Sequence, residues 1–132
     1  MTSSNTAPSH SAPTGGVLDA AISNAVVGLI RERVGRGPTK ARTIHSGKVV
    51  LCVLEETMTK AERTLVSAGE DDFVLRMRAA LQHVMRQELT AAVEGLTRHK
   101  VVAFMSANHV APDLAAELFV LDEPLAEQED AE

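Results

Sequence analysis

The amino-acid sequence predicts one α+β domain of two layers, with helices packed on one face of a four-stranded, mainly antiparallel sheet. Three segments carry apolar residues at the three- and four-residue spacing of a helix, and four short segments are strand-like. Their order is α-β-β-α-α-β-β, which favours separate helical and strand layers. The 132 residues, 45% apolar and 23% charged, suit one domain with a packed core.

The first predicted helix covers residues 17–34. Its apolar residues recur on one stripe, which is typical of a helix that packs on a core. Gly35 is placed to end the helix, and Gly37 followed by Pro38 prevents the helix from resuming.

Two strands joined by a tight turn follow this helix. We predict strands over residues 41–46 and 48–54, with Gly47 supplying the positive φ that a short hairpin needs. A short helix then starts at Thr59, because Thr59 and Glu62 form a capping-box pattern.

A long helix and two further strands complete the predicted order. The acidic residues 70–72 suit the positive end of a helix dipole, so the helix is expected to run from there to about residue 96. Residues 101–106 and 117–121 are strand-like, and a loop is expected between them.

Both ends of the chain are predicted to be tails. Residues 1–16 contain no Asp, Glu, Lys or Arg and are rich in Ser, Thr, Pro and Gly, which predicts disorder. Residues 122–132 hold six acids and no base, which predicts an acidic disordered tail. The domain is therefore expected to span residues 17–121.

Glu88 lies inside the apolar sector that the spacing predicts for the long helix. That sector consists of Phe73, Met77, Leu81, Val84, Met85, Ala92 and Leu96. We expect a buried or paired carboxylate there, held at the margin between helix and sheet by an arginine such as Arg42. The alternative is a proton-carrying or ligand-contacting group with a shifted pKa.

Positive charge is concentrated in residues 31–48, which hold six bases and one acid, a local net charge of +5. The candidate anion- or partner-binding residues in this segment are Gly35, Arg36, Gly37, Lys40 and Arg42. They combine backbone freedom with positive charge, although the spacing is not that of a P-loop. The simpler alternative is a helix stop with arginines that complement the helix dipole.

Composition and motifs exclude several kinds of site. Three Phe and no Trp or Tyr leave no aromatic platform for single-stranded nucleic acid. The single cysteine, Cys52, excludes an intrachain disulfide and a multi-cysteine zinc site, and its apolar strand makes it a core residue. No histidine spacing places two ligands on one metal, and no nucleophile motif is present. We therefore expect no metal, no cofactor and no catalytic residue.

Four short segments carry a resemblance to a known family. They are Gly35-Arg36-Gly37-Pro38, Thr59-Lys60-Ala61-Glu62, Arg86-Gln87-Glu88-Leu89 and the Val101-Val102 strand that leads to Ser106. In this arrangement residues 35–121 resemble the MpsC-like family, which includes YbcI-type proteins and was long described as of unknown function. The resemblance implies a small soluble component that accompanies a membrane subunit and a large cytosolic partner in a membrane-potential-generating or inorganic-carbon uptake system.

We therefore interpret the chain as a non-enzymatic accessory or interaction domain, resembling the soluble component of a bacterial membrane-potential-generating or bicarbonate/cation transport system. Its expected partners are a membrane transport subunit or that subunit's cytosolic partner. No apolar run approaches the roughly 18 residues of a membrane span, so we expect a cytoplasmic protein, or one held at the membrane through a partner.

Two other function classes are considered. A KH-like nucleic-acid-binding module shares most of the element order, and residues 31–48 would then contact phosphates. It is less favoured because residues 1–121 carry a net charge of only +1 and the tail is acidic. A small enzyme that uses Glu88 lacks a second catalytic group.

The predicted strands also indicate self-association. In the strand over residues 48–54, Val49, Leu51 and Val53 face one side, and Val50, Cys52 and Leu54 face the other. The helices of this chain cover one face only, and a bare second apolar face is unusual in a monomer. We expect a homodimer or larger assembly, with a heterologous partner on this face as the alternative.

Overall fold

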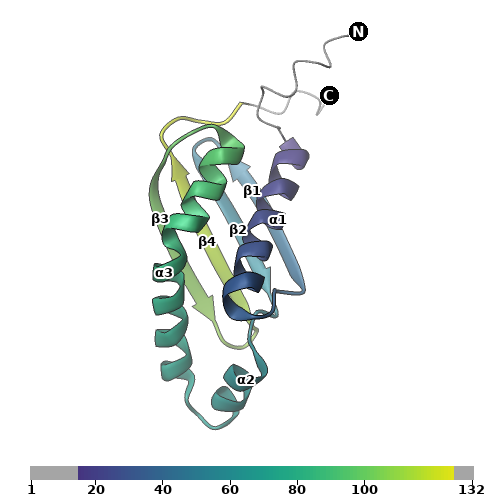
Figure 1. The fold of residues 1–132 in the computed structure, drawn as a ribbon, viewed down its shortest axis with the longest axis vertical. Helices are drawn as coiled ribbons and strands as arrows, with labels where there is room; N and C mark the ends of the chain where they lie inside the picture. The colour runs from purple at the N-terminus through teal and green to yellow at the C-terminus, as the bar shows by residue number, and fades with distance from the viewer. Residues whose placement is uncertain (1–14, 127–132) are drawn as a thin grey trace.

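The computed structural model of the protein describes residues 15–126 (Figure 1). In chain order its elements are α1 (Gly15–Val34), β1 (Lys40–Ser46), β2 (Val49–Glu55), α2 (Lys60–Ser67), α3 (Asp71–Thr97), β3 (Val101–His109) and β4 (Leu114–Leu121). The predicted order α-β-β-α-α-β-β is confirmed. Residues 1–14 and 127–132, most of the two predicted tails, lie outside the described residues.

The four strands form one open antiparallel sheet in the order β1-β2-β4-β3. Helices α1 and α3 lie over the same face of this sheet and contact each other, α1 nearer β1 and α3 nearer β3 (Figure 1). The short α2 packs against α3 at one end of the two layers. The α+β architecture with helices on one face is therefore as the sequence predicts.

The core lies between this sheet face and the two long helices. Its buried members include Leu18, Ile22 and Val26 of α1, Val50, Cys52 and Leu54 of β2, Met85, Leu89 and Val93 of α3, and Phe119 and Leu121 of β4. Cys52 is fully buried, as expected from its strand, and burial raises the pKa of its thiol.

The last two strands are longer than predicted. Residues 107–109 and 114–116, which the sequence analysis leaves in a loop, pair with each other as the ends of β3 and β4. Polar residues such as Asn108 hide this strand character in the sequence, because their side chains find partners inside the fold. The register also shifts once between Val101 and Ala103, which is a β-bulge.

Residues 122–126 continue the ordered chain rather than beginning a tail. The Asp122 N–H donates to the Lys100 carbonyl at 2.8 Å, and the Leu125 N–H donates to the Gly47 carbonyl at 3.0 Å. The Leu125 side chain packs against the core. The ordered domain therefore extends a few residues beyond the predicted boundary at residue 121.

The rotation of α3 about its axis differs from the prediction. Three residues that were assigned to the core face are solvent-exposed: Phe73 at 46%, Met77 at 40% and Val84 at 74%. Met85 of the predicted sector is buried, and Leu81 and Leu96 pack against the core. The other buried positions of the helix are Val74, Leu89, Val93 and Thr97. The apolar residues of the helix fill a wide arc from Phe73 to Val93, and spacing alone does not say which part of the arc faces the sheet.

The observed rotation makes a direct prediction for two single variants. Leu89→Ala lowers the free energy of unfolding by about 2–5 kcal/mol, because it leaves a cavity in a packed core. Val84→Ala changes it by less than about 0.5 kcal/mol, because Val84 is in solvent. Urea unfolding measures both, and equal losses would contradict this rotation.

Candidate functional site

The loop after α1 is held by structural contacts. Gly35 has a φ of +96°, which favours glycine, and its N–H donates to the Arg31 carbonyl at 2.9 Å to end the helix. A Cβ on Gly37 would lie 3.2 Å from a methyl carbon of Val27, so this residue passes close to α1. The Arg36 guanidinium donates to the Met58 carbonyl in the segment before α2.

The other two basic candidates lie elsewhere. Lys40 and Arg42 are exposed on the face of β1 that points away from the helices, beside Ile44, Val53 and Glu55. The five candidate residues Gly35, Arg36, Gly37, Lys40 and Arg42 are therefore divided between a loop that braces α1 and the outer face of the sheet. The structure does not bring their charges to one point.

Glu88 is at the helix margin, and its partner is Arg33 of α1 rather than Arg42. The Arg33 Nε donates to the Glu88 Oε1 at 2.9 Å, and Nη2 donates to Oε2. This hydrogen bond, more than the charge itself, lowers the pKa of the Glu88 carboxyl below its usual 4.5. Glu88 links the two long helices at the surface.

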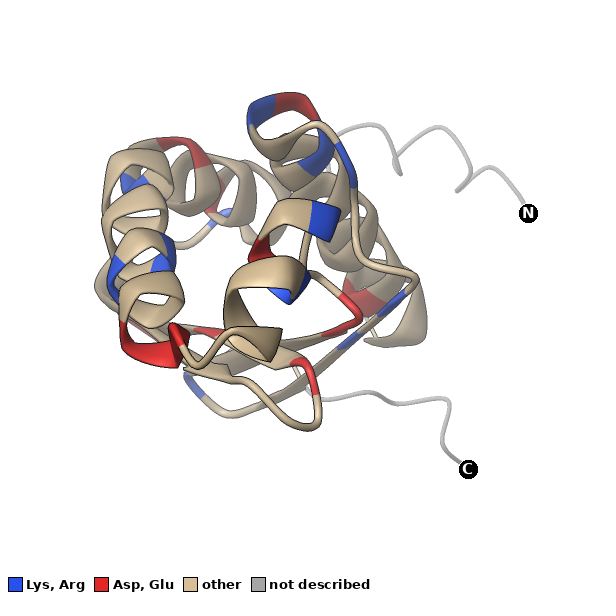
Figure 2. Ribbon diagram, turned by 90° about the horizontal axis from the view of Figure 1, so that it is seen from below, with Lys and Arg blue, Asp and Glu red and all other residues tan. Residues whose placement is uncertain are grey.

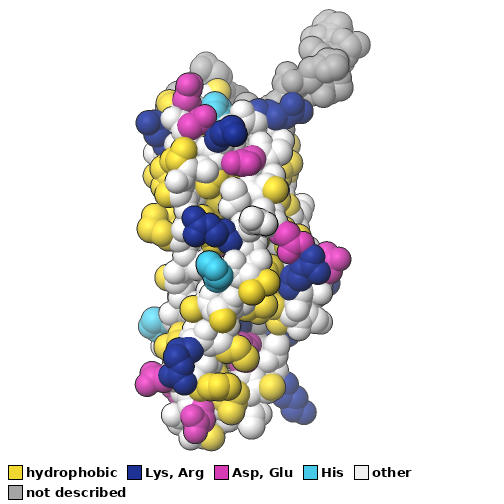
Figure 3. Space-filling model, turned by 60° about the vertical axis from the view of Figure 1, so that its left-hand side comes forward, with side chains coloured by type: hydrophobic (Ala, Val, Ile, Leu, Met, Phe, Trp, Pro, Cys, Tyr) yellow, Lys and Arg dark blue, Asp and Glu magenta, His cyan; other side chains and the backbone are white. Residues whose placement is uncertain are grey.

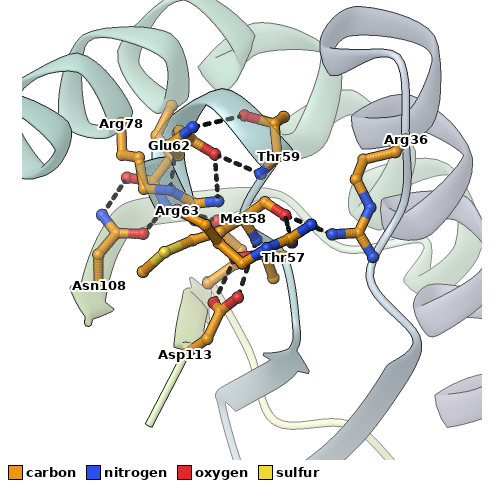
Figure 4. Close-up of polar contacts among 11 residues, drawn as sticks. Arg36, Thr57, Met58, Thr59, Glu62, Arg63, Arg78, Asn108 and Asp113 are labelled. Carbon is orange, nitrogen blue, oxygen red and sulfur yellow. Dashed lines mark hydrogen bonds and ion pairs between the residues drawn. The ribbon is translucent and has the colours of Figure 1, made fainter. Parts of the chain in front are cut away.

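The buried carboxylates are two that the sequence analysis did not single out, Glu62 and Glu117, 4% and 2% exposed. Glu62 closes the predicted capping box of α2: its Oε1 accepts from the Thr59 N–H at 2.8 Å, and the Thr59 hydroxyl accepts from the Glu62 N–H. Arg78 of α3 donates to both carboxylate oxygens of Glu62 at 3.1 Å (Figure 4). This bidentate pair fastens α2 to α3.

Glu117 lies on the core face of β4. Its Oε2 accepts from the Gln82 amide at 2.9 Å, and its Oε1 accepts from the Ser106 hydroxyl. Gln82 and Asn108 bond each other through both amide groups, at 2.8 and 3.2 Å. Burial raises the pKa of the Glu117 carboxyl, and the bonds from Ser106 and Gln82 and the charge of Arg78 partly oppose this.

We call Glu62, Arg78, Gln82, Ser106, Asn108 and Glu117 the polar cluster. It lies at the end of the core next to α2, and a small, mostly apolar cavity lies between it and α1. Strand alternation in the sequence could have indicated that Glu117 is buried, because Glu117 shares a strand face with Phe119 and Leu121. The pairing of Glu62 with Arg78 joins residues 16 apart across a turn, and no local spacing rule indicates it.

The segment between β2 and α2 is anchored on the turn between β3 and β4. Asp113 accepts from the Thr57 hydroxyl and from the Met58 N–H, both at 2.9 Å (Figure 4). The Met58 carbonyl accepts from Arg63 at 2.8 Å as well as from Arg36. These contacts use Arg36 to position the chain rather than to present a free charge.

The outer face of the sheet is largely apolar. Cross-strand partners share a face, so the register gives three apolar-rich rows across the sheet. They are Ser46, Val49, Val120 and Ala103; Ile44, Leu51, Leu118 and Met105; and Arg42, Val53, Ala116 and Ala107. Ile44, Val49 and Met105 are 41–51% exposed. A fourth row, Lys40, Glu55, Leu114 and His109, borders them and is more polar.

Comparison with known proteins identifies the family. Residues 14–123 match the family described as "Na+-translocating membrane potential-generating system (MpsC)". The chain belongs to the MpsC family. No curated protein and no solved structure gives a significant match.

Two features are absent from the described part of the chain. Among residues 15–126, no helix combines the length and apolar content needed to cross a bilayer. Within the same residues, no three His, Cys, Asp or Glu side chains are grouped as metal ligands.

The buried pair predicts a strong and partly reversible loss of stability. Arg78→Met leaves the Glu62 carboxylate buried with only its backbone partner, which lowers the free energy of unfolding by about 3–5 kcal/mol. Adding Glu62→Gln removes the unpaired charge and recovers part of that loss. Denaturant unfolding of the single and double variants measures this, and strictly additive losses would contradict a coupled pair.

Glu117 and Glu88 predict opposite pH dependences. The pKa of Glu117 is raised on folding, so this carboxyl makes wild-type stability fall as pH rises from 4.5 through the folded pKa. The stability of Glu117→Gln relative to the wild type therefore increases over that range. The pKa of Glu88 is lowered on folding, so the contribution of its carboxylate to stability is lost as pH falls below 4.5. The stability of Glu88→Gln relative to the wild type therefore decreases as pH rises over this range. Thermal unfolding across this range gives both trends, and parallel curves for the two variants would contradict the assignment.

Proposed function

We propose that this MpsC-family chain is a non-enzymatic accessory subunit of a membrane-potential-generating ion transport system, acting in the cytoplasm by binding other proteins. Family membership supports the link to such a system. The observation that carries the proposal is the apolar outer face of the sheet, which the helices of this chain leave uncovered. A surface of this kind is typical of a protein that works by association.

The first occupant of this face is a second copy of the chain. With a two-fold axis in the interface and parallel to the strands, β1 packs over β3 of the partner copy, and each row meets the same row. The apolar rows of Leu51 and Val49 then meet their equivalents, and the polar row of Lys40 and Glu55 stays at one border. A two-fold axis in the interface but perpendicular to the strands would instead place the polar row of one copy against an apolar row of the other.

The size of the face is sufficient for a dimer. Four strands about 4.8 Å apart and seven residues of about 3.3 Å each give roughly 400 Å² of flat area per copy. Side-chain relief increases the accessible area, so two copies bury on the order of 1,000 Å², near the lower end for specific interfaces. A transport subunit or its cytosolic partner on the same face is the heterologous alternative.

The nucleic-acid alternative has less support. Arg33 and Arg36 are engaged by Glu88 and by the Met58 carbonyl, and Lys40 and Arg42 lie among apolar residues of the outer sheet face. In the view of Figure 2, basic and acidic segments are interspersed. Phosphate binding is favoured by bases gathered on one surface.

The outer face is tested with the double variant Leu51→Asp/Leu118→Asp. Val50 and Phe119 are not chosen for substitution, because they lie on the opposite strand face and point into the core. Charged residues at 51 and 118 face each other across the dimer, so light scattering shows a dimer for the wild type and a monomer for the variant. Val84→Asp, an equally apolar exposed position on α3, is the matched control and stays dimeric.

The same variants test the function in cells of the source organism that lack this chain. Membrane potential, measured with a voltage-sensitive dye, is restored by the wild type and by Val84→Asp, and not by the double variant at equal protein level. A wild type that is monomeric, with the double variant active in cells, would overturn the role of this face. A monomeric wild type with an inactive double variant would favour the heterologous partner.

A further inference from the structure

The two edges of the sheet differ in how they are protected. β1 carries Lys40 and Arg42, and charged side chains on an edge strand oppose the pairing of another chain. The nine residues of β3, VVAFMSANH, include no Lys, Arg, Asp or Glu. Val102 and Met105 on this strand are 64% and 51% exposed. Among the described residues β3 pairs with β4 alone, so it is an open edge with unpaired backbone groups along one side.

A groove runs beside this edge, between β3 and α3. Leu75, Ala79, His83 and Arg86 line it from α3, and Phe104 and Ser106 line it from β3. The Arg86 guanidinium lies over the Phe104 ring, 5.9 Å from its centroid, so an apolar floor stands next to a positive charge. Figure 3 shows this side of the molecule, where apolar side chains alternate with separate basic and His side chains.

We infer that the β3 edge and this groove bind an extended peptide segment of a partner protein that alternates apolar and polar residues and carries an acidic side chain facing Arg86. Main-chain hydrogen bonds to β3 add a fifth strand to the sheet. Alternate side chains of the added strand then enter the groove, an apolar one over Leu75 and Ala79 and an acidic one at Arg86. Among residues 15–126 Arg86 has no carboxylate in ion-pair distance.

Charge favours a different protein over a second copy at this edge. Pairing β3 with its own copy would bring the two α3 helices alongside each other through the flank that carries Arg86. Two like charges would then meet, and β3 itself supplies no acid to offset them. An acidic peptide supplies the missing charge.

The site is tested with the full chain and a random library of nine-residue peptides displayed on phage. We expect enriched peptides that alternate apolar and polar residues and contain Asp or Glu. Their synthetic forms lose affinity about tenfold or more for Arg86→Glu, because a salt bridge becomes a like-charge contact. Arg98→Glu, an exposed arginine just after α3 and outside the groove lining, is the control and binds as the wild type does.

NMR spectra of the labelled chain locate the peptide. The expected shifts lie at the amides of residues 101–109 and of α3 from Leu75 to Arg86, with β1 unchanged. No enrichment, enriched peptides without acids, equal loss in both arginine variants, or shifts confined to the outer sheet face would each overturn the inference. The variant Leu51→Asp/Leu118→Asp retains peptide binding, so failure here and failure of the proposed dimer are distinguishable.

Discussion

The structure depends on the one-sided burial of a four-stranded sheet. Two long helices are enough to cover one face, so Val50, Cys52 and Phe119 lie in the core while their neighbours along the same strands face outward. Because β2 and β4 are central strands rich in apolar residues on both sides, the uncovered face is apolar too. The same constraint thus stabilises the fold and creates the surface on which association is expected.

The polar cluster lies at the end of the core next to α2. Buried carboxylates are costly unless they are paired, and both Glu62 and Glu117 have partners for each oxygen. These bonds join α2, α3, β3 and β4.

The sequence predicted what local patterns determine: element order, the capping box at Thr59, the helix stop at Gly35 and burial of Cys52. It did not predict the rotation of α3, because the apolar residues of this helix fill an arc wider than the face that is buried. It named Glu88 as the carboxylate toward the core, whereas Glu117 is the buried one on the sheet side. Partners such as those of Glu117 come from three separate elements, so no spacing rule finds them.

The exposed apolar residues of α3 give the polar contacts of this helix a selective role. Turned about its axis, the helix would place Phe73, Met77 and Val84 against the sheet. That competing arrangement would break the pairings of α3 with Glu62, Glu117 and Arg33 together. The apolar residues make α3 pack on the sheet, and its polar contacts favour the observed rotation of the helix over the other one.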